Sequence, residues 1–395
     1  MAARSILWTG LTVLVSVTLW NCGGDSDSGG ANPGGTGGAS AAGGAGGSSG
    51  STPTGGGGAG GTQSDSGSGG VAGGGAGGTS TGGSAGSAGG PTFVGRCSDP
   101  IPAGATPPPS PPSYSQGTCP SFAAGANSIQ TAGGKRNFLL VLPADPKPGE
   151  SFPLVFLWHW LKGKAQDFVD RAEVQKAVDA QRFIAVVPEQ KGDLFFVWPV
   201  ESIQSDARIQ EELTFFDDLY ACVDSAYTVN RSCVASTGVS AGALWTDQLA
   251  HRRSEYLASF MSLSGGVGGL AIKPWGTPKR KIPGMVLWGG PTDNCIGLFS
   301  FEALSKELET KLTQGGHFFL ECIHNCGHSE PPFTTGVTSK YEGLWNFVLD
   351  HPYWLSPGVS VYQTTGIPST FPEWCGIGQG SSKPREGACI DGSKC

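Results

Sequence analysis

A serine between two glycines stands in a local pattern that could support nucleophilic catalysis. Gly238, Ser240 and Gly242 match G-x-S-x-G, with a β-prone run before the motif and a helix-compatible run after it. Strand, tight turn and helix in this order form a nucleophile elbow, which holds the serine at strained backbone angles above the sheet edge. A Cβ at either glycine would collide with the neighbouring strand or helix. The pattern predicts Ser240 as a nucleophile, although in a chain with 65 glycines an ordinary strand-to-helix turn is the alternative.

An acid and a histidine follow two later apolar runs. Asp293 comes after the run that ends at Trp288, and His328 comes after the run that ends at Ile323. A serine hydroxyl is a poor nucleophile until a base takes its proton. An imidazole can take it near neutral pH, and a buried carboxylate fixes the imidazole tautomer. The order Ser…Asp…His is that of α/β-hydrolases. We therefore expect Asp293 as the acid and His328 as the base.

Other residues compete for these two roles. His324 lies closer to the end of the same strand and is the main alternative base. The glycine before His328, and its place after the last parallel strand, favour His328. Asp293 stands in Pro-Thr-Asp-Asn, which is also good turn chemistry. Asp247 lies inside the helix after the motif, where we expect it to point away from the serine.

Short apolar runs alternate with helical patterns from about residue 127 onward. The apolar runs typical of strands lie at 137–143, 154–159, 183–188, 233–237, 258–263, 283–288 and 317–323, and helical spacing lies at 165–181, 206–227, 301–312 and 337–349. This alternation predicts an α/β fold with a mostly parallel central sheet and helices on both faces. Ligands bind beyond the carboxyl ends of such strands, so the serine, acid and histidine would meet at one sheet edge.

At these residues the chain resembles the polyhydroxybutyrate depolymerase-like esterases, a group related to feruloyl and acetylxylan esterases. The resemblance covers roughly residues 119–353 and rests on the segments 136–143, 153–168, 183–190, 230–243, 289–294 and 327–328. It implies an α/β-hydrolase fold and secreted carboxylic-ester hydrolysis. By position it implies Ser240 as nucleophile, Asp293 as acid and His328 as base, with the N–H groups of Ala241 and Leu161 forming the oxyanion hole.

Two features depart from that family. The family has His-Gly after its third strand, whereas this chain has His159–Trp160, and the added Cβ constrains the loop that would carry the Leu161 N–H. The segment 355–395 is short for a separate polymer-binding domain, which favours soluble or surface-displayed esters over crystalline polymer.

The expected function is a serine esterase that acts through an acyl-enzyme on polyhydroxyalkanoate oligomer, feruloyl or acetyl esters. No cofactor and no metal are expected. The alternatives are a catalytically inactive hydrolase-fold protein that binds at the cell surface, and a peptidase on the same fold.

The N-terminus has the pattern of an export signal. Arg4 precedes a mostly apolar run, 6–20, and Cys22 follows it. This arrangement resembles a bacterial lipoprotein signal with Cys22 as the lipidated residue, although Asn21 stands where that pattern prefers a small residue. We expect a cell-surface lipoprotein; cleavage and release as an extracellular protein is the alternative.

Composition divides the chain into five parts: a signal peptide 1–21, a flexible Gly/Ser/Ala-rich linker 22–96, a Pro-rich linker 97–118, an α/β-hydrolase catalytic domain 119–354 and a Cys-containing tail 355–395. The first linker has almost no large apolar side chain, so it cannot bury enough surface to offset its chain entropy. The formal net charge is −7 and no Lys/Arg stripe occurs, so nucleic acid is not an expected partner. Membrane contact is expected only through a lipid on Cys22.

The cysteines of an exported chain are expected to form disulfides. The chain has 11 cysteines, and setting Cys22 aside leaves an even number. Cys295 follows Asp293 by two residues, and Cys326 precedes His328 by two residues. If the acid and base loops lie side by side, these two cysteines come within reach of a bridge. We therefore predict a Cys295–Cys326 disulfide.

Cys222 and Cys233 are a second candidate pair, because they would join a helix end to the strand that leads into the serine motif. For the Cys/His cluster at 322–328, a zinc site is the alternative to disulfide bonding.

Overall fold

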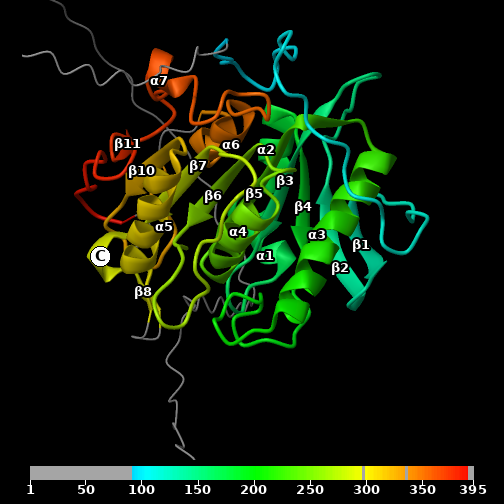
Figure 1. Cartoon of the computed structure of the whole chain (residues 1–395), viewed down its shortest axis with the longest axis horizontal. Helices are drawn as coiled ribbons and strands as arrows, with labels where there is room; N and C mark the ends of the chain where they lie inside the picture. The colour runs from blue at the N-terminus through cyan, green and yellow to red at the C-terminus, as the bar shows by residue number, and fades with distance from the viewer. Residues whose placement is uncertain (1–90, 296–298, 334–336, 390–395) are drawn as a thin grey trace, which may run out of the picture. The chain divides into compact units, whose positions relative to one another are not determined.

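The computed structural model describes residues 91–295, 299–333 and 337–389 (Figure 1). The predicted signal peptide, the lipidation site at Cys22 and nearly all of the Gly-rich linker lie outside the described residues. Within those residues, no helix has both the length and the apolar character that a membrane span needs.

The described chain contains a nine-stranded sheet in the order β1-β2-β4-β3-β5-β6-β7-β10-β11. Its strands are β1 (Gly125–Thr131), β2 (Gly134–Val141), β3 (Phe152–Trp158), β4 (Ile184–Pro188), β5 (Val229–Val239), β6 (Ser259–Leu263), β7 (Gly284–Trp288), β10 (Phe319–Ile323) and β11 (Cys375–Ile377). From β4 to β10 all neighbours are parallel, and the strands at the two edges are antiparallel. Every residue of β3, β4, β6 and β7 is buried, as expected for strands with both faces covered.

Helices cover both faces of this sheet. They are α1 (Ala165–Arg171), α2 (Val174–Gln181), α3 (Asp206–Ala226), α4 (Ala241–Arg252), α5 (Phe301–Gly315), α6 (Glu342–Leu349) and α7 (Tyr362–Thr365). One core cluster joins α3, α4 and α5, which lie in front of the sheet in Figure 1, to alternate strand residues such as Phe156. A second cluster joins α1, α2 and α6 to the intervening residues such as Leu157. The predicted α/β architecture, mostly parallel with helices on both faces, is confirmed.

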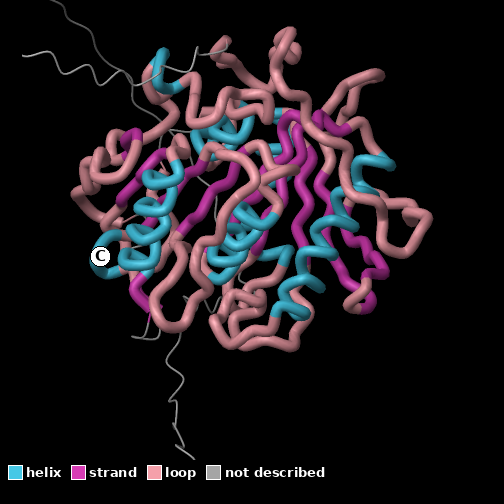
Figure 2. The backbone as a smooth tube through the Cα atoms, viewed as in Figure 1, coloured by secondary structure: helices cyan, strands magenta, loops and turns pink. Residues whose placement is uncertain are grey.

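Some element boundaries differ from the prediction. The single helix expected over 165–181 is two helices, because Glu173 has a left-handed backbone (φ 47°) that interrupts the turn between them. The closing helix begins at Glu342, later than expected. Figure 2 shows the helices and strands along the backbone. The edge strands β1 and β11 were not predicted. The short strands β8 (Asn294–Cys295) and β9 (Phe299–Ser300) form a separate hairpin beside the sheet.

The predicted disulfide pairings are wrong. The structure pairs Cys97 with Cys233, Cys119 with Cys222, Cys322 with Cys375 and Cys326 with Cys389. Cys295 is also disulfide-bonded, and none of these eight cysteines is its partner. The loops that carry Asp293 and His328 meet without a disulfide between them. They are joined instead by a hydrogen bond from the Gly327 N–H to the Gly289 carbonyl, at 3.0 Å. Cys222 and Cys233 are instead bonded to residues of the N-terminal segment.

Residues 97–118, expected to be a linker, are attached to the sheet domain. The backbone N–H of Cys97 donates to the Leu349 carbonyl at 2.8 Å, in addition to the bridge to Cys233. The backbone and hydroxyl of Ser115 both donate to Asp218, at 2.8 and 2.7 Å. The tail contributes β11 and two bridging cysteines. The folded unit therefore extends beyond the limits that we expected, 119 and 354.

Candidate active site

Ser240 occupies a sharp turn between β5 and α4. Its backbone angles, φ 56° and ψ −120°, lie outside the regions that side-chain-bearing residues normally adopt. Its N–H donates to the Leu263 carbonyl at 2.9 Å, and its carbonyl accepts from the Leu244 N–H at 3.0 Å. The neighbouring strand and the first turn of α4 therefore hold the strained conformation in place.

The two glycines of the motif are required by close backbone packing. A Cβ at Gly238 would lie 2.0 Å from the carbonyl oxygen of Gly242, and a Cβ at Gly242 would lie 1.9 Å from the carbonyl oxygen of Trp158. Neither oxygen can move without displacing a strand or a helix. The steric requirement expected from the sequence is confirmed, and it brings the end of β3 directly against the start of α4.

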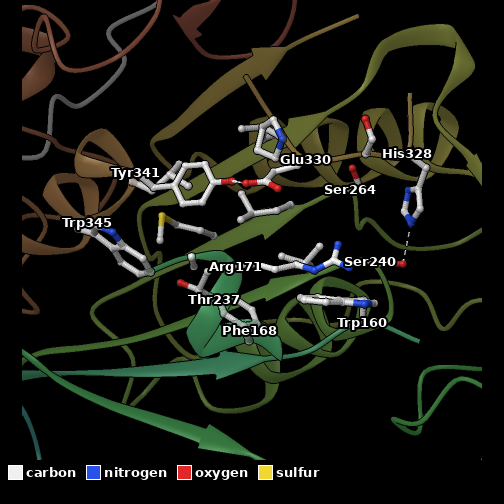
Figure 3. Close-up of a pocket in the computed structure, with 18 residues that line it drawn as sticks. Trp160, Phe168, Arg171, Thr237, Ser240, Ser264, His328, Glu330, Tyr341 and Trp345 are labelled. Carbon is white, nitrogen blue, oxygen red and sulfur yellow. Dashed lines mark hydrogen bonds between the residues drawn. The ribbon is translucent and has the colours of Figure 1, made fainter. Parts of the chain in front are cut away.

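His328 lies between the serine and the acid. Its Nε2 is 2.8 Å from Ser240 Oγ (Figure 3). Its Nδ1 is 2.7 Å from Asp293 Oδ1. A carboxylate only accepts, so Nδ1 carries the proton and Nε2 is free to accept from the serine hydroxyl. The Phe301 ring stacks on the imidazole with centroids 4.3 Å apart, which limits its rotation. The three residues that the sequence placed at one sheet edge are brought together there.

Asp293 is fully buried, and its second oxygen is also occupied. Oδ2 accepts from the Ser264 hydroxyl and from the Gly289 N–H, both at 2.8 Å. Its carbonyl accepts from the Phe301 N–H at 2.9 Å, at the start of α5. The carboxylate is thus fixed by the ends of β6 and β7, and the backbone of Asp293 by the start of α5. Ser264 was missed in the sequence, although its position directly after a predicted strand was a usable signal.

His324, the alternative base, is buried away from the serine. Its Nδ1 accepts from the Cys326 N–H at 3.2 Å, and its ring packs edge-on against Trp374. Burial lowers the pKa of His324 to about 4, so the ring is neutral in the folded protein at neutral pH. His324 is therefore a residue of the core.

Asp247 points away from the serine, as expected. Its Oδ2 accepts from the Ser262 hydroxyl at 2.8 Å and from the Gly266 N–H at 2.7 Å. Burial raises the pKa of this carboxyl well above its usual value.

The candidate oxyanion residues lie on two segments that touch. Ala241 is the first residue of α4, where backbone N–H groups have no partner inside the helix. Leu161 belongs to the loop that follows β3, and this loop is closed by a hydrogen bond from the Gly163 N–H to the Trp160 carbonyl at 3.0 Å. Trp160 itself lines the same cavity as Ser240. Two N–H donors from these segments could face one carbonyl oxygen.

A cavity of about 150 Å³ opens at Ser240 and His328. It runs along the sheet face that α1 and α6 cover, and most of its wall is apolar. At its mouth the exposed guanidinium of Arg171 lies over the Trp160 ring, 5.1 Å from its centroid. Above it, the Glu330 carboxylate binds Lys340 and the Tyr341 hydroxyl. The cavity offers an apolar space next to the reactive hydroxyl.

The Cys/His cluster at 322–328 has no free thiolate to offer a metal, because Cys322 and Cys326 are both in disulfides. In the described part of the chain, no group of three possible metal ligands lies close enough together to hold an ion.

No family model matches the sequence. Solved structures match over most of the described domain. Native pOPH has a TM-score of 0.54 at 15% identity, covering 66% of this chain and 97% of that one. Native sOPH has a TM-score of 0.52 at 18% identity, covering 67% and 99%. With the sheet order, the sharp serine turn and the Ser…Asp…His order, these matches decide the fold.

The chain has the α/β-hydrolase fold. A CE1 ferulic acid esterase from Anaeromyces mucronatus also matches, with a TM-score of 0.42 at 14% identity over 58% of this chain and 90% of that one. In this fold the nucleophile, acid and base follow separate strands. In this chain Ser240, Asp293 and His328 follow β5, β7 and β10.

Proposed function

We propose that the protein is a serine esterase that hydrolyses carboxylic esters through an acyl-enzyme. The observation that carries this proposal is the position of His328, within 2.8 Å of Ser240 Oγ and 2.7 Å of Asp293 Oδ1. Such an array has one use in hydrolases, which is to make a hydroxyl nucleophilic at neutral pH.

The first step is attack of Ser240 Oγ on the ester carbonyl carbon, while His328 Nε2 takes the hydroxyl proton. The carbonyl electrons move to the oxygen, and the N–H groups of Ala241 and Leu161 bind the resulting oxyanion. Asp293 stabilises the imidazolium. The tetrahedral intermediate then expels the alcohol, which receives the proton from His328. Water repeats the sequence on the acyl-enzyme, releasing the acid and restoring the serine.

The substrates are polyhydroxyalkanoate oligomers, feruloyl esters or related carboxylic esters. An apolar cavity of about 150 Å³ is large enough for a benzene-sized group. This size supports an acyl group larger than acetyl.

The test of this proposal is Ser240→Ala. We expect it to lower kcat/KM for p-nitrophenyl butyrate by at least about a thousandfold and to abolish labelling by a fluorophosphonate, with an unchanged far-UV spectrum. Ser202→Ala, at an exposed serine in the loop before α3, is the matched control and should behave as wild type.

Near wild-type turnover in Ser240→Ala would overturn the serine-esterase proposal. A wild-type protein that resists the fluorophosphonate would instead support an inactive binding protein, and preferential cleavage of peptides would support a peptidase.

We further propose that the enzyme is exported and anchored to the cell surface through Cys22, with the Gly-rich segment as a spacer. The four disulfides between described residues are compatible with an oxidising compartment. Palmitate labelling of expressing cells should mark the wild-type protein, and Cys22→Ser should release it into the medium. Equal release of both forms would exclude the anchor.

A further inference from the structure

The end of the cavity farthest from Ser240 contains two buried polar atoms without hydrogen-bond partners among the described residues. They are Oγ1 of Thr237 and Nε1 of Trp345. Both residues line the cavity, and their exposed fractions are only 1% and 2%. Figure 3 shows both on the opposite side of the cavity from Ser240 and His328.

The strand register explains why Thr237 faces the cavity. Along β5, Thr237 and Val239 point to the same face, because side chains alternate. On that face they pair with Met261 and Leu263 of β6, which also line the cavity. Two residues of a strand span about 7 Å, so Thr237 lies roughly 7–10 Å deeper than the reactive serine.

A hydroxyl at this position has no structural benefit. A buried polar group without a partner destabilises the folded state. Valine has the same shape as threonine and a high preference for strands, so it would fill the site at no such cost. The surrounding wall, including Met261, Leu287 and Leu344, is apolar. A few unpartnered polar atoms, here Thr237 Oγ1 and Trp345 Nε1, in an otherwise apolar pocket are the arrangement that fixes the orientation of a ligand.

We propose that Thr237 determines acyl-group specificity by hydrogen-bonding an oxygen at the far end of the substrate's acyl group. This inference rests on the esterase function proposed above and deepens it. The preferred acyl group is no larger than a benzene-sized unit and the short chain that joins it to the ester carbonyl. It carries a hydroxyl roughly 7–10 Å from that carbonyl. Both a flat aromatic acid with a para-hydroxyl and a straight ω-hydroxyalkanoic acid have this chemistry.

The test compares two pairs of esters whose members differ only at the distal position. The pairs are methyl 4-hydroxycinnamate with methyl cinnamate, and p-nitrophenyl 6-hydroxyhexanoate with p-nitrophenyl heptanoate. We expect the wild type to prefer the hydroxylated member of at least one pair by about tenfold in kcat/KM, the effect of one neutral hydrogen bond. The preferred pair identifies whether the natural acyl group is aromatic or aliphatic.

Thr237→Val should reduce that preference to about one, by lowering kcat/KM for the hydroxylated ester only. Its Tm should be equal to or higher than that of the wild type, because the unpartnered hydroxyl has been removed. Thr246→Val is the matched control, since the Thr246 hydroxyl does have a partner, Ser236 Oγ at 3.2 Å. That variant should lose stability and keep the wild-type preference.

Three results would overturn the assignment: no preference within either pair, a preference that survives Thr237→Val, or a lower Tm of that variant together with an equal loss on both esters.

Binding to Ser240→Ala separates this inference from the proposed function. This variant keeps the cavity, and calorimetry should show that it binds 4-hydroxycinnamic acid or 6-hydroxyhexanoic acid about tenfold more tightly than the analogue without the hydroxyl. Adding Thr237→Val should remove the difference. Discrimination in binding without any wild-type ester hydrolysis would refute the esterase proposal alone, whereas hydrolysis without discrimination in binding would refute the role of Thr237.

Discussion

Asp247 and Asp293 are two buried aspartates with closely similar surroundings and different consequences. Asp247, in α4, places Oδ2 against the Ser262 hydroxyl at 2.8 Å and the Gly266 N–H at 2.7 Å. Asp293, in the loop after β7, places Oδ2 against a serine hydroxyl and a glycine N–H, both at 2.8 Å. Both side chains are fully buried. Each Oδ2 therefore accepts from the same two kinds of donor, a serine hydroxyl and a glycine N–H.

The difference lies in the other oxygen. Oδ1 of Asp293 meets His328 Nδ1 at 2.7 Å, whereas Oδ1 of Asp247 has no hydrogen-bond partner among the described residues. Burial raises the pKa of Asp247 well above its usual value. A serine and a backbone N–H are thus enough to hold a carboxyl group in place. A third contact, to an imidazole, is what connects such a group to the catalysis proposed above.

Asparagine substitution at the two sites should give the largest contrast. Asp293→Asn leaves the shape intact and favours the wrong imidazole tautomer, so we expect kcat/KM to fall about 10³–10⁴-fold. Asp247→Asn should stay within about tenfold of the wild type, because its carboxyl does not touch the reacting groups. Both variants should remain folded by circular dichroism. A large loss of activity in Asp247→Asn would break the comparison.

The pH dependence of the free energy of unfolding should show a smaller effect, at Asp247. Because its folded-state pKa is raised, Asp247 keeps a proton that the unfolded chain releases near pH 4. The free energy of unfolding therefore falls as the pH rises from about 4 toward the raised pKa of Asp247, by up to about 1.4 kcal/mol per pH unit. Asparagine has no such proton. In urea titrations between pH 4.5 and 8, Asp247→Asn should gain stability relative to the wild type as the pH increases.

If the free energies of unfolding of the wild type and Asp247→Asn change with pH in parallel, this carboxyl is charged in the folded protein. That result would contradict its raised pKa.

The serine donors should give the smallest effect. Ser264→Ala removes one hydrogen bond to Asp293, and we expect about a tenfold decrease in kcat/KM. Ser262→Ala removes the equivalent bond to Asp247, so it should lower Tm and leave kcat/KM nearly unchanged. Equal activities of the two variants would mean that the Ser264 hydroxyl has no part in orienting the acid.

The sequence predicted the fold and the grouping of Ser240, Asp293 and His328 because their signals are local. Ser240, Asp293 and His328 each follow a strand closely, and parallel strands bring their carboxyl ends to one edge. Disulfide pairing depends instead on segments far apart in the chain: Cys97 and Cys233 are separated by 136 residues. Thr237 could not be identified either. Only the three-dimensional packing reveals that its hydroxyl lacks a partner among the described residues, since a threonine in a strand is otherwise ordinary.

The disulfide between Cys326 and Cys389 sets an order of events for the synthesis of this protein. Cys326 is two residues before His328, and its bonding partner is 63 residues further along the chain. The serine turn and the acid loop precede this point, so they can form while the loop of the base is still without its covalent anchor. The anchor requires the remaining residues to be made and both thiols to be oxidised. Under the function and the export proposed above, full esterase activity is delayed until the chain has reached an oxidising compartment.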